Sequence, residues 1–439
     1  MKRIWWLAAA VLCLAALPSP SVRAAVIQPV PCGEDVLNEV KISPADGNIG
    51  GLFGWSSDID GDFAVIGTPG DDDDGVFNSG AAYVYRRDAG NVWVQEAKLL
   101  PALPQVGARF GEGVAISGDT VVVGAYGTTV NGLAFSGAVH VFRRDGSGFW
   151  NLEAFVTPID TGPFIGPFGD QFGYSVEIDG DRMIVGATHD DDLALDSGAA
   201  YIFQRFGTTW FQTAKLHGSD GVGVDSKFLG NDVGLHGNTA AVGPAHDHTL
   251  GLDAGAAYVY DFNGTSWIET KILAADGKAR DVFGTSVSVG SMGVVAGAYG
   301  DDDAPAGSPS LFRGAAYVFE KVGGVWTQKA KLFDAAGGNQ DYFGFQVAIS
   351  GNTMVASRLE FSSVEGRAYV YRRNASGVWK LLKKVQASDT APGLGFSGSV
   401  SASGKTLLIG AYGFDGAAIN SGAAYIYSIE KVCVEETIP

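Results

Sequence analysis

A unit that begins with Phe-Gly recurs along this chain of 439 residues, and an internal repeat restricts a fold more than any local pattern does. One copy reads FGYSVEIDGDRMIVGATHDDDLALDSGAAYIFQRFGTTWFQTAKL, from Phe172 to Leu216. Further Phe-Gly copies begin at Phe53, Phe110, Phe283 and Phe343, and we expect degenerate copies to begin at Phe228 and Phe396. The starts are 53 to 62 residues apart, which gives seven units.

Each unit contains four short segments with the patterns of β-strands. SVEI alternates polar and apolar residues, MIVGA is a continuous apolar run, GAAYIF follows, and Trp210 to Leu216 ends the unit. Glycine-containing turns such as DGDR join the first two segments, as in β-hairpins. Four antiparallel strands repeated seven times predict an all-β, seven-bladed β-propeller. A β-solenoid is the alternative, although its repeats are shorter.

The two ends of the chain fit together as parts of one blade. The seventh unit runs to Val432 without a fourth strand, and VLNEVKI, Val36 to Ile42, aligns with the fourth-strand sequence WVQEAKL. We therefore expect the N-terminal strand to complete the last blade, leaving no open sheet edge. The propeller would span residues 36–433, with a segment 25–35 before it and a tail 434–439 after it.

The first residues have the features of a signal peptide. Met1-Lys2-Arg3 gives the chain a basic start. An apolar run from Ile4 to Leu17 follows, and it is short for a membrane span. Val22-Arg23-Ala24 then fits a cleavage site. We predict cleavage after Ala24 and a secreted or periplasmic protein; a retained anchor is the alternative.

Cleavage would remove Cys13 and leave one cysteine at each end of the propeller, Cys32 and Cys433. An even pair in an exported protein predicts a disulfide, and the last blade would bring these two residues together. Such a bond would close a loop of about 400 residues and stabilise the ring by on the order of 5 kcal/mol.

The charge of the chain excludes one class of partner. The net charge is −18, and −21 once the three basic residues of the signal peptide are removed, whereas nucleic-acid phosphates require a basic surface. No later stretch is long and apolar enough for membrane insertion. We expect a monomer that binds neither nucleic acid nor the bilayer.

The motifs resemble a known family. Phe-Gly followed by VVGA or IGTP, and later by SGAAYVY, is similar to the FG-GAP repeat of integrin α-subunit propellers and of many bacterial exported proteins, over about residues 36 to 432. The resemblance implies a propeller that binds ligands at one face. Many such blades hold calcium in an Asp-x-Asn-x-Asp-Gly-x-x-Asp loop between strands 1 and 2. Here that loop has shrunk to sequences such as IDGD (59–62), so calcium is possible but not supported by this loop, and we interpret its aspartates as turn residues.

Aspartates gather in the loops between strands 2 and 3, which in a propeller lie on the same face as the loops between strand 4 and the next strand 1. The arginines gather in the connections between strands 3 and 4, so we expect one acidic face. Its binding candidates are Asp72, Asp191, Asp247 and Asp302. The aspartate runs could be solvated turns, a surface for a cationic partner or a sugar, or a divalent cation site. The metal candidates are Asp71, Asp73, Asp190, Asp192, Asp301 and Asp303.

Two histidines occupy the same repeat position in neighbouring blades. His189 and His246 each precede an aspartate, which suggests a transition-metal or binding role, with surface coincidence as the alternative. His140 lies within a third strand, where we expect it to be packed.

The motifs of common enzymes are missing from the sequence. It has no nucleophile elbow, zincin helix or phosphate-binding glycine loop. We therefore expect an exported, non-catalytic binding module that needs no cofactor and recognises a protein or a glycan through its acidic face. The alternatives are a polysaccharide lyase or hydrolase built on a propeller, and a structural spacer of the cell envelope.

Overall fold

The computed structural model describes residues 32–72, 75–159, 169–221, 226–302, 312–337, 340–359, 366–389, 393, 395–416 and 418–433. All regular elements in these ranges are strands, and they form seven four-stranded sheets. The predicted all-β, seven-bladed propeller is confirmed. The described residues contain no helix that is long and apolar enough to cross a membrane.

The chain forms two compact units. Asp35–Glu430 contains the propeller, and the described residues 32–34 and 431–433 belong to the other unit. The expected signal peptide and C-terminal tail lie outside the described residues.

The first four blades follow one another along the chain. Blade 1 contains β2 (Ser57–Asp60), β3 (Phe63–Thr68), β4 (Ala81–Arg87) and β5 (Trp93–Leu99). Blade 2 contains β6 (Val114–Ser117), β7 (Thr120–Ala125), β8 (Ala138–Arg144) and β9 (Trp150–Val156). Blade 3 contains β10 (Phe172–Asp179), β11 (Arg182–Ala187), β12 (Ala199–Phe206) and β13 (Thr209–Leu216). Blade 4 contains β14 (Leu229–His236), β15 (Thr239–Pro244), β16 (Ala257–Phe262) and β17 (Trp267–Ile272).

The remaining blades use both ends of the chain. Blade 5 contains β18 (Phe283–Gly290), β19 (Gly293–Ala298), β20 (Ala315–Val322) and β21 (Val325–Leu332). Blade 6 contains β22 (Phe343–Ser350), β23 (Thr353–Arg358), β24 (Arg367–Arg373) and β25 (Trp379–Val385). Blade 7 contains β26 (Phe396–Ser403), β27 (Thr406–Ala411), β28 (Ala423–Cys433) and β1 (Cys32–Ile42).

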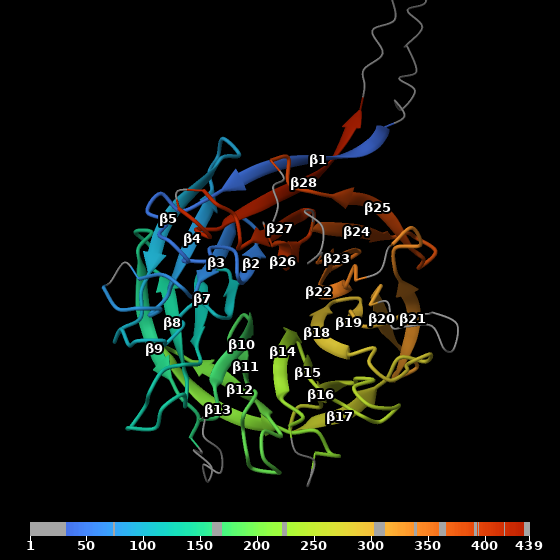
Figure 1. The fold of residues 1–439 in the computed structure, drawn as a ribbon, viewed down its shortest axis with the longest axis horizontal. Helices are drawn as coiled ribbons and strands as arrows, with labels where there is room; N and C mark the ends of the chain where they lie inside the picture. The colour runs from blue at the N-terminus through green and yellow to red at the C-terminus, as the bar shows by residue number, and fades with distance from the viewer. Residues whose placement is uncertain are drawn as a thin grey trace, which may run out of the picture. The chain divides into compact units, whose positions relative to one another are not determined.

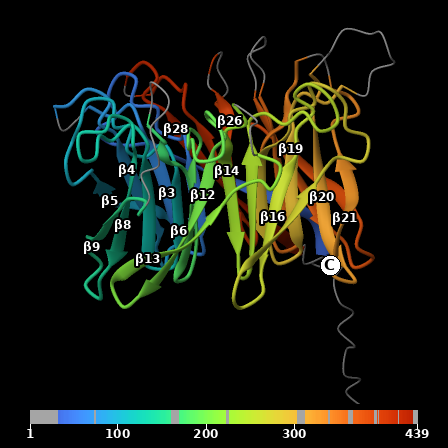
Figure 2. The same ribbon diagram turned by 90° about the horizontal axis from the view of Figure 1, so that it is seen from below.

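The seven sheets surround a common axis, with the first strand of each blade innermost (Figure 1). Figure 2 shows that the connecting loops gather at the two ends of the ring. Second strands such as β7, β19 and β27 are buried along their whole length, because neighbouring blades cover both of their faces. This burial accounts for their continuous apolar sequences.

Glycines at repeated positions let adjacent blades approach closely. At six of the seven seams, the glycine before the third strand pairs with the residue that opens the next repeat, as Gly80 does with Phe110. In the second strand, a Cβ on Gly186 would lie 2.1 Å from the carbonyl oxygen of Gly230 in the next blade. A side chain at either seam position would therefore push two blades apart.

One repeat boundary differs from the prediction. Blade 4 begins at Leu229 rather than Phe228, because Leu229 pairs with Gly198 and Gly230 has the left-handed φ of 93° found at the Phe-Gly glycines. Phe396 does open blade 7, where Ser397 takes the glycine position with φ of 68°.

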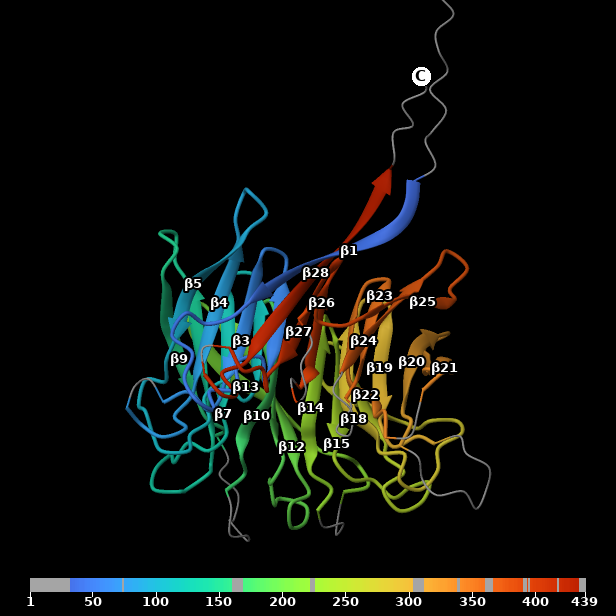
Figure 3. The same cartoon turned by 45° about the horizontal axis from the view of Figure 1, so that its top comes forward.

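The N-terminal strand lies beside the C-terminal strand in blade 7 (Figure 3). The sheet order β1-β28-β27-β26 agrees with the expected closure of the ring. The side chains of Cys32 and Cys433 lie outside the described part of the structure, so the disulfide stays a prediction.

Candidate functional site

Two sets of loops meet at one end of the propeller, and we call this end the loop face. The carbonyl oxygen of Phe77, between strands 2 and 3, accepts a hydrogen bond of 3.0 Å from the amide of Gly107, which lies between strand 4 and the next strand 1. Leu195 and Ser226 make the same contact at 2.7 Å. These bonds fix the predicted pairing of the two loop sets.

Beneath the loop face, an aspartate, a tyrosine and a lysine form a buried polar cluster in several blades. In blade 5 the hydroxyl of Tyr317 donates to Asp301 at 2.6 Å and to Asp276 at 3.1 Å. The ammonium of Lys331 lies 2.7 Å from Asp276 and 2.8 Å from Asp301. Equivalent clusters contain Asp71, Tyr83 and Lys98 in blade 1, Asp190, Tyr201 and Lys215 in blade 3, and Asp247, Tyr258 and Lys271 in blade 4.

These clusters correct the interpretation of the aspartate runs as solvated turns. Asp71, Asp190 and Asp301 are only 2%, 2% and 5% exposed. Burial opposes ionisation of the partner Asp276, but Lys331 and Tyr317 outweigh burial and lower its pKa. The first aspartate of each run is therefore buried and is held by a lysine and a tyrosine.

Blades 6 and 7 keep parts of the cluster. In blade 6 Tyr369 donates to Asp334 and Lys384 lies 3.0 Å from it, while Arg358 adds a second cation 2.5 Å from Asp341. In blade 7 Phe414 stands at the aspartate position, and the ammonium of Lys41 lies 3.3 Å from the centre of its ring.

Blade 2 replaces all three members at once. Thr128, His140 and Phe155 occupy the positions of the aspartate, tyrosine and lysine. His140 packs edge-on against Phe110 and Phe155 at 5.0 Å each, as expected for a packed strand residue, and burial lowers its pKa to about 4. Its environment keeps the imidazole neutral.

The other predicted aspartates hold loops in shape. Asp72 accepts from the amide of Asn78 at 2.5 Å, and Asp191 accepts from that of Asp196 at 2.7 Å. Asp192 pairs with Lys215. Asp302 is half-buried, and Asp73 and Asp303 lie outside the described residues.

The predicted histidine pair is brought together around an aromatic ring. His189 and His246 pack on Phe228 with ring centres 5.1 and 5.8 Å away. His246 also contacts Asp253 at 2.9 Å. Within the described ranges, no group of three or more His, Cys, Asp or Glu is arranged to hold a metal ion.

Apolar side chains extend from the loop face at equivalent repeat positions. They belong to Phe77, Leu195, Leu252 and Ile419, which are 65%, 37%, 57% and 63% exposed. The carbonyl oxygen of each accepts a hydrogen bond from the neighbouring blade's loop at 2.7 to 3.0 Å. Their backbones are thus fixed by the fold while their side chains remain available.

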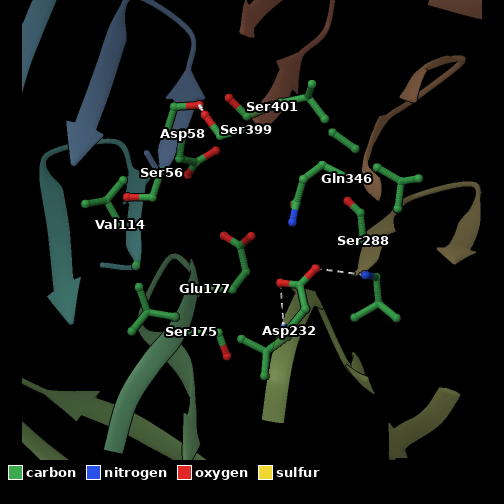
Figure 4. A pocket seen from close by; sticks show the side chains of 18 of the residues that line it. Ser56, Asp58, Val114, Ser175, Glu177, Asp232, Ser288, Gln346, Ser399 and Ser401 are labelled. Carbon is green, nitrogen blue, oxygen red and sulfur yellow. Dashed lines mark hydrogen bonds between the residues drawn. The ribbon is translucent and has the colours of Figure 1, made fainter. Parts of the chain in front are cut away.

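A cavity of about 790 Å³ runs along the propeller axis, and the first strands line it. Alternate residues face it, as Ser175, Glu177 and Asp179 do in β10. Figure 4 shows the carboxyl groups of Glu177 and Asp232 and the side-chain amide of Gln346 directed into one space.

The axis-facing side chains also join neighbouring blades. Asp58 accepts from the amide of Ile116 at 2.8 Å, and Asp232 from that of Val287 at 2.9 Å. Asp60 and Asp179 accept in the same way from hairpin glycines of the next blade, at 2.8 and 2.6 Å. The interpretation of these two aspartates as local turn residues missed their role between blades.

Burial shapes the acidity of the axial carboxyl groups. It raises the pKa of Asp58 and of Asp232 to about 6, although each accepts two backbone hydrogen bonds. Burial and the charge of nearby Asp58 raise the pKa of Glu177 well above its usual range. The sequence contained one signal for this site, the polar residues alternating through the first strands.

Comparisons with known proteins agree with this architecture. The FG-GAP repeat model matches residues 37–85, 93–142, 150–203, 210–260, 267–319, 326–371 and 379–427. Each match begins in a fourth strand and ends in the third strand of the following blade, which is the offset that lets β1 complete blade 7. No curated protein sequence matches the chain.

A crystal structure of a protein from Lactobacillus plantarum is similar with a TM-score of 0.42 and 11% identity, covering 76% of this chain and 85% of that one. The seven repeat matches, one for each blade, show that the chain belongs to the FG-GAP repeat family.

Proposed function

We propose that the protein is an exported, non-catalytic binding module whose ligand surface is the loop face. The observation that carries the proposal is the set of exposed apolar side chains at equivalent positions, Phe77, Leu195, Leu252 and Ile419. Isolated exposed apolar residues are common, but a set repeated around one face of a propeller is typical of a contact surface.

The chemistry of the same surface points to the class of partner. Partly exposed carboxylates accompany the apolar residues, among them Asp46, Asp220 and Asp276, whose side chains are 46%, 43% and 41% exposed. In blades 1 and 5 the exposed aspartate shares one lysine with a buried aspartate, which leaves an excess of negative charge. In blade 4 Lys227 and Lys271 together balance Asp220 and Asp247. A protein segment with apolar and basic residues would complement this surface, and a glycan is the second candidate.

At the loop face, the positions of the acids favour binding over catalysis. Beneath the loop face the carboxylates of Asp71, Asp190 and Asp301 are each held by a lysine and a tyrosine of their own blade. An acid–base pair for lyase or hydrolase chemistry would instead require carboxyl groups converging on one substrate position.

The test is a selection of ligands on the full chain, using a displayed random peptide library and a glycan array. The loop-face variant combines Phe77→Ser, Leu252→Ser and Ile419→Ser. The matched control combines Phe149→Ser, Phe206→Ser and Val378→Ser, which are similarly exposed but lie in or next to connections between strands 3 and 4.

We expect selected ligands to bind the loop-face variant at least about tenfold more weakly, because exposed anchors dominate such contacts, and to bind the control unchanged. If the selected ligands bind the loop-face variant normally but no longer bind the control variant, the binding site lies at the opposite end of the propeller. A selection that yields no ligand would contradict the proposed binding function.

A further inference from the structure

We propose that the axial cavity is a binding site for a small, elongated organic cation that carries primary ammonium groups, such as a linear diamine or triamine. The site is separate from the loop-face surface and lies along the first strands, between the loop face and the hairpins joining strands 1 and 2.

The charges that line the cavity require a cation. Asp58, Glu177 and Asp232 surround its middle, and Asp60 and Asp179 lie nearer the hairpin end. No lysine or arginine is among the described residues that line it. Burial raises the pKa values of the three central carboxyl groups, and the charges of nearby carboxylates raise those of Asp58 and Glu177 as well.

An unpartnered hydroxyl gives a second, independent indication of a ligand. Ser401 lines the cavity beside Ser399 (Figure 4), is 6% exposed, and its Oγ has no hydrogen-bond partner. The equivalent side chains Asp58 and Ser288 accept from the next blade's amide. For Ser401 that amide belongs to Ile59, which donates to Asp58 at 2.8 Å instead. A buried hydroxyl without a partner is costly, and a ligand N–H would satisfy it.

The size and shape of the cavity favour an organic ligand over a single metal ion. A volume of about 790 Å³ falls within the range of small-molecule pockets. The described carboxylates do not form a cluster of metal-site geometry. Carboxyl groups spaced along an axis can instead each meet one ammonium group of an extended chain.

Aromatic rings complete the site at the loop-face end. Trp55 and Tyr412 lie 5.1 Å apart there, and Tyr299 lies 5.8 Å from Phe345. Their faces suit the methylene segments and the terminal ammonium of an aliphatic amine. Glu112 at this end is already paired with Arg109 at 2.8 Å, so the carboxyl groups that can meet a ligand cation lie deeper along the axis.

The test is calorimetric titration of the full chain with spermidine, with 1,8-octanediol as an uncharged probe of similar length and with magnesium chloride as a control for simple charge screening. We expect binding of spermidine with one site and no binding of the diol. Glu177→Gln and Asp232→Asn should each weaken spermidine binding at least about tenfold, because each removes a charge-assisted contact.

Asp119→Asn is the matched charge control, since Asp119 is exposed and is not among the residues that line the cavity. Absence of spermidine binding, or an equal loss in Asp119→Asn and Glu177→Gln, would overturn the proposal. Thermal unfolding of each variant shows whether a loss reflects misfolding. The triple loop-face variant should bind spermidine normally, so failure of the loop-face function and failure of this site are distinguishable.

Discussion

At the scale of single residues, the buried aspartates are stabilised by partners that come from later strands. Asp301 lies on the inner side of its loop, where Lys331 supplies the charge and Tyr317 supplies a hydroxyl donor. A buried carboxylate is tolerable only with such partners, so the lysine is a structural requirement of the blade. The aspartate therefore fixes where the loop leaves strand 2.

This dependence gives the first prediction. Lys331→Met should lower the free energy of unfolding by about 2–3 kcal/mol, because it leaves the buried Asp301 without its cation. Lys321→Met on the preceding strand is the control: Lys321 pairs with Asp261 at 2.8 Å but is 41% exposed, so its loss should cost less than about 1 kcal/mol. Urea denaturation measures both, and equal effects of the two substitutions would contradict a structural role for the cluster.

At the scale of elements, neighbouring blades meet both through close backbone contacts and through the large side chains of the core between them. The second-strand glycine of one blade faces the carbonyl of the Phe-Gly glycine in the next, as Gly186 faces Gly230. The Phe side chain then enters the core between blades, where Phe172 packs edge-on against Tyr201 at 5.4 Å. The glycines thus allow neighbouring blades to approach closely, and the phenylalanine of the motif fills the core between them.

The seam gives the second prediction. Gly186→Ala should destabilise the propeller by about 1–3 kcal/mol, because its Cβ would lie 2.1 Å from the carbonyl oxygen of Gly230 and the blades must separate. Gly146→Ala, in a connection where a Cβ meets nothing within 4 Å, should change stability by less than about 0.5 kcal/mol. Thermal unfolding monitored by circular dichroism compares the two variants. If Gly186→Ala leaves stability unchanged, the seam between the blades is not tightly packed.

At the scale of the whole molecule, the sequence repeat predicts the ring of seven blades, whereas it predicts the candidate functional site only in part. Seven copies, together with the fourth-strand sequence at the N-terminus, determine blade number and closure without any contact being known. The burial of Asp71 could not be predicted locally, because Lys98 is 27 positions away and reaches it only once strand 4 is in place. The axial contacts join different blades, so a single repeat read alone makes Asp60 look like a turn residue.

The ring also concentrates like charges at its axis, and this gives the third prediction. Burial raises the pKa values of Asp58 and Asp232 to about 6, burial and the charge of Asp58 raise that of Glu177 well above its usual range, and Asp179 is an additional axial acid. A carboxyl group whose pKa is higher in the folded state binds protons preferentially there. Its contribution to stability is therefore complete below about pH 4 and is lost as the pH rises through the folded-state value.

Glu177→Gln should consequently stabilise the protein at pH 8 by on the order of 1–3 kcal/mol, and should change little at pH 4, where the carboxyl group is protonated in both states. Asp119→Asn, which removes an exposed charge, should be nearly neutral at both values. Denaturant unfolding at the two pH values measures the difference. A Glu177→Gln variant that is less stable than the parent at pH 8 would mean that the glutamate already has a compensating partner, and the axis would not then carry uncompensated charge.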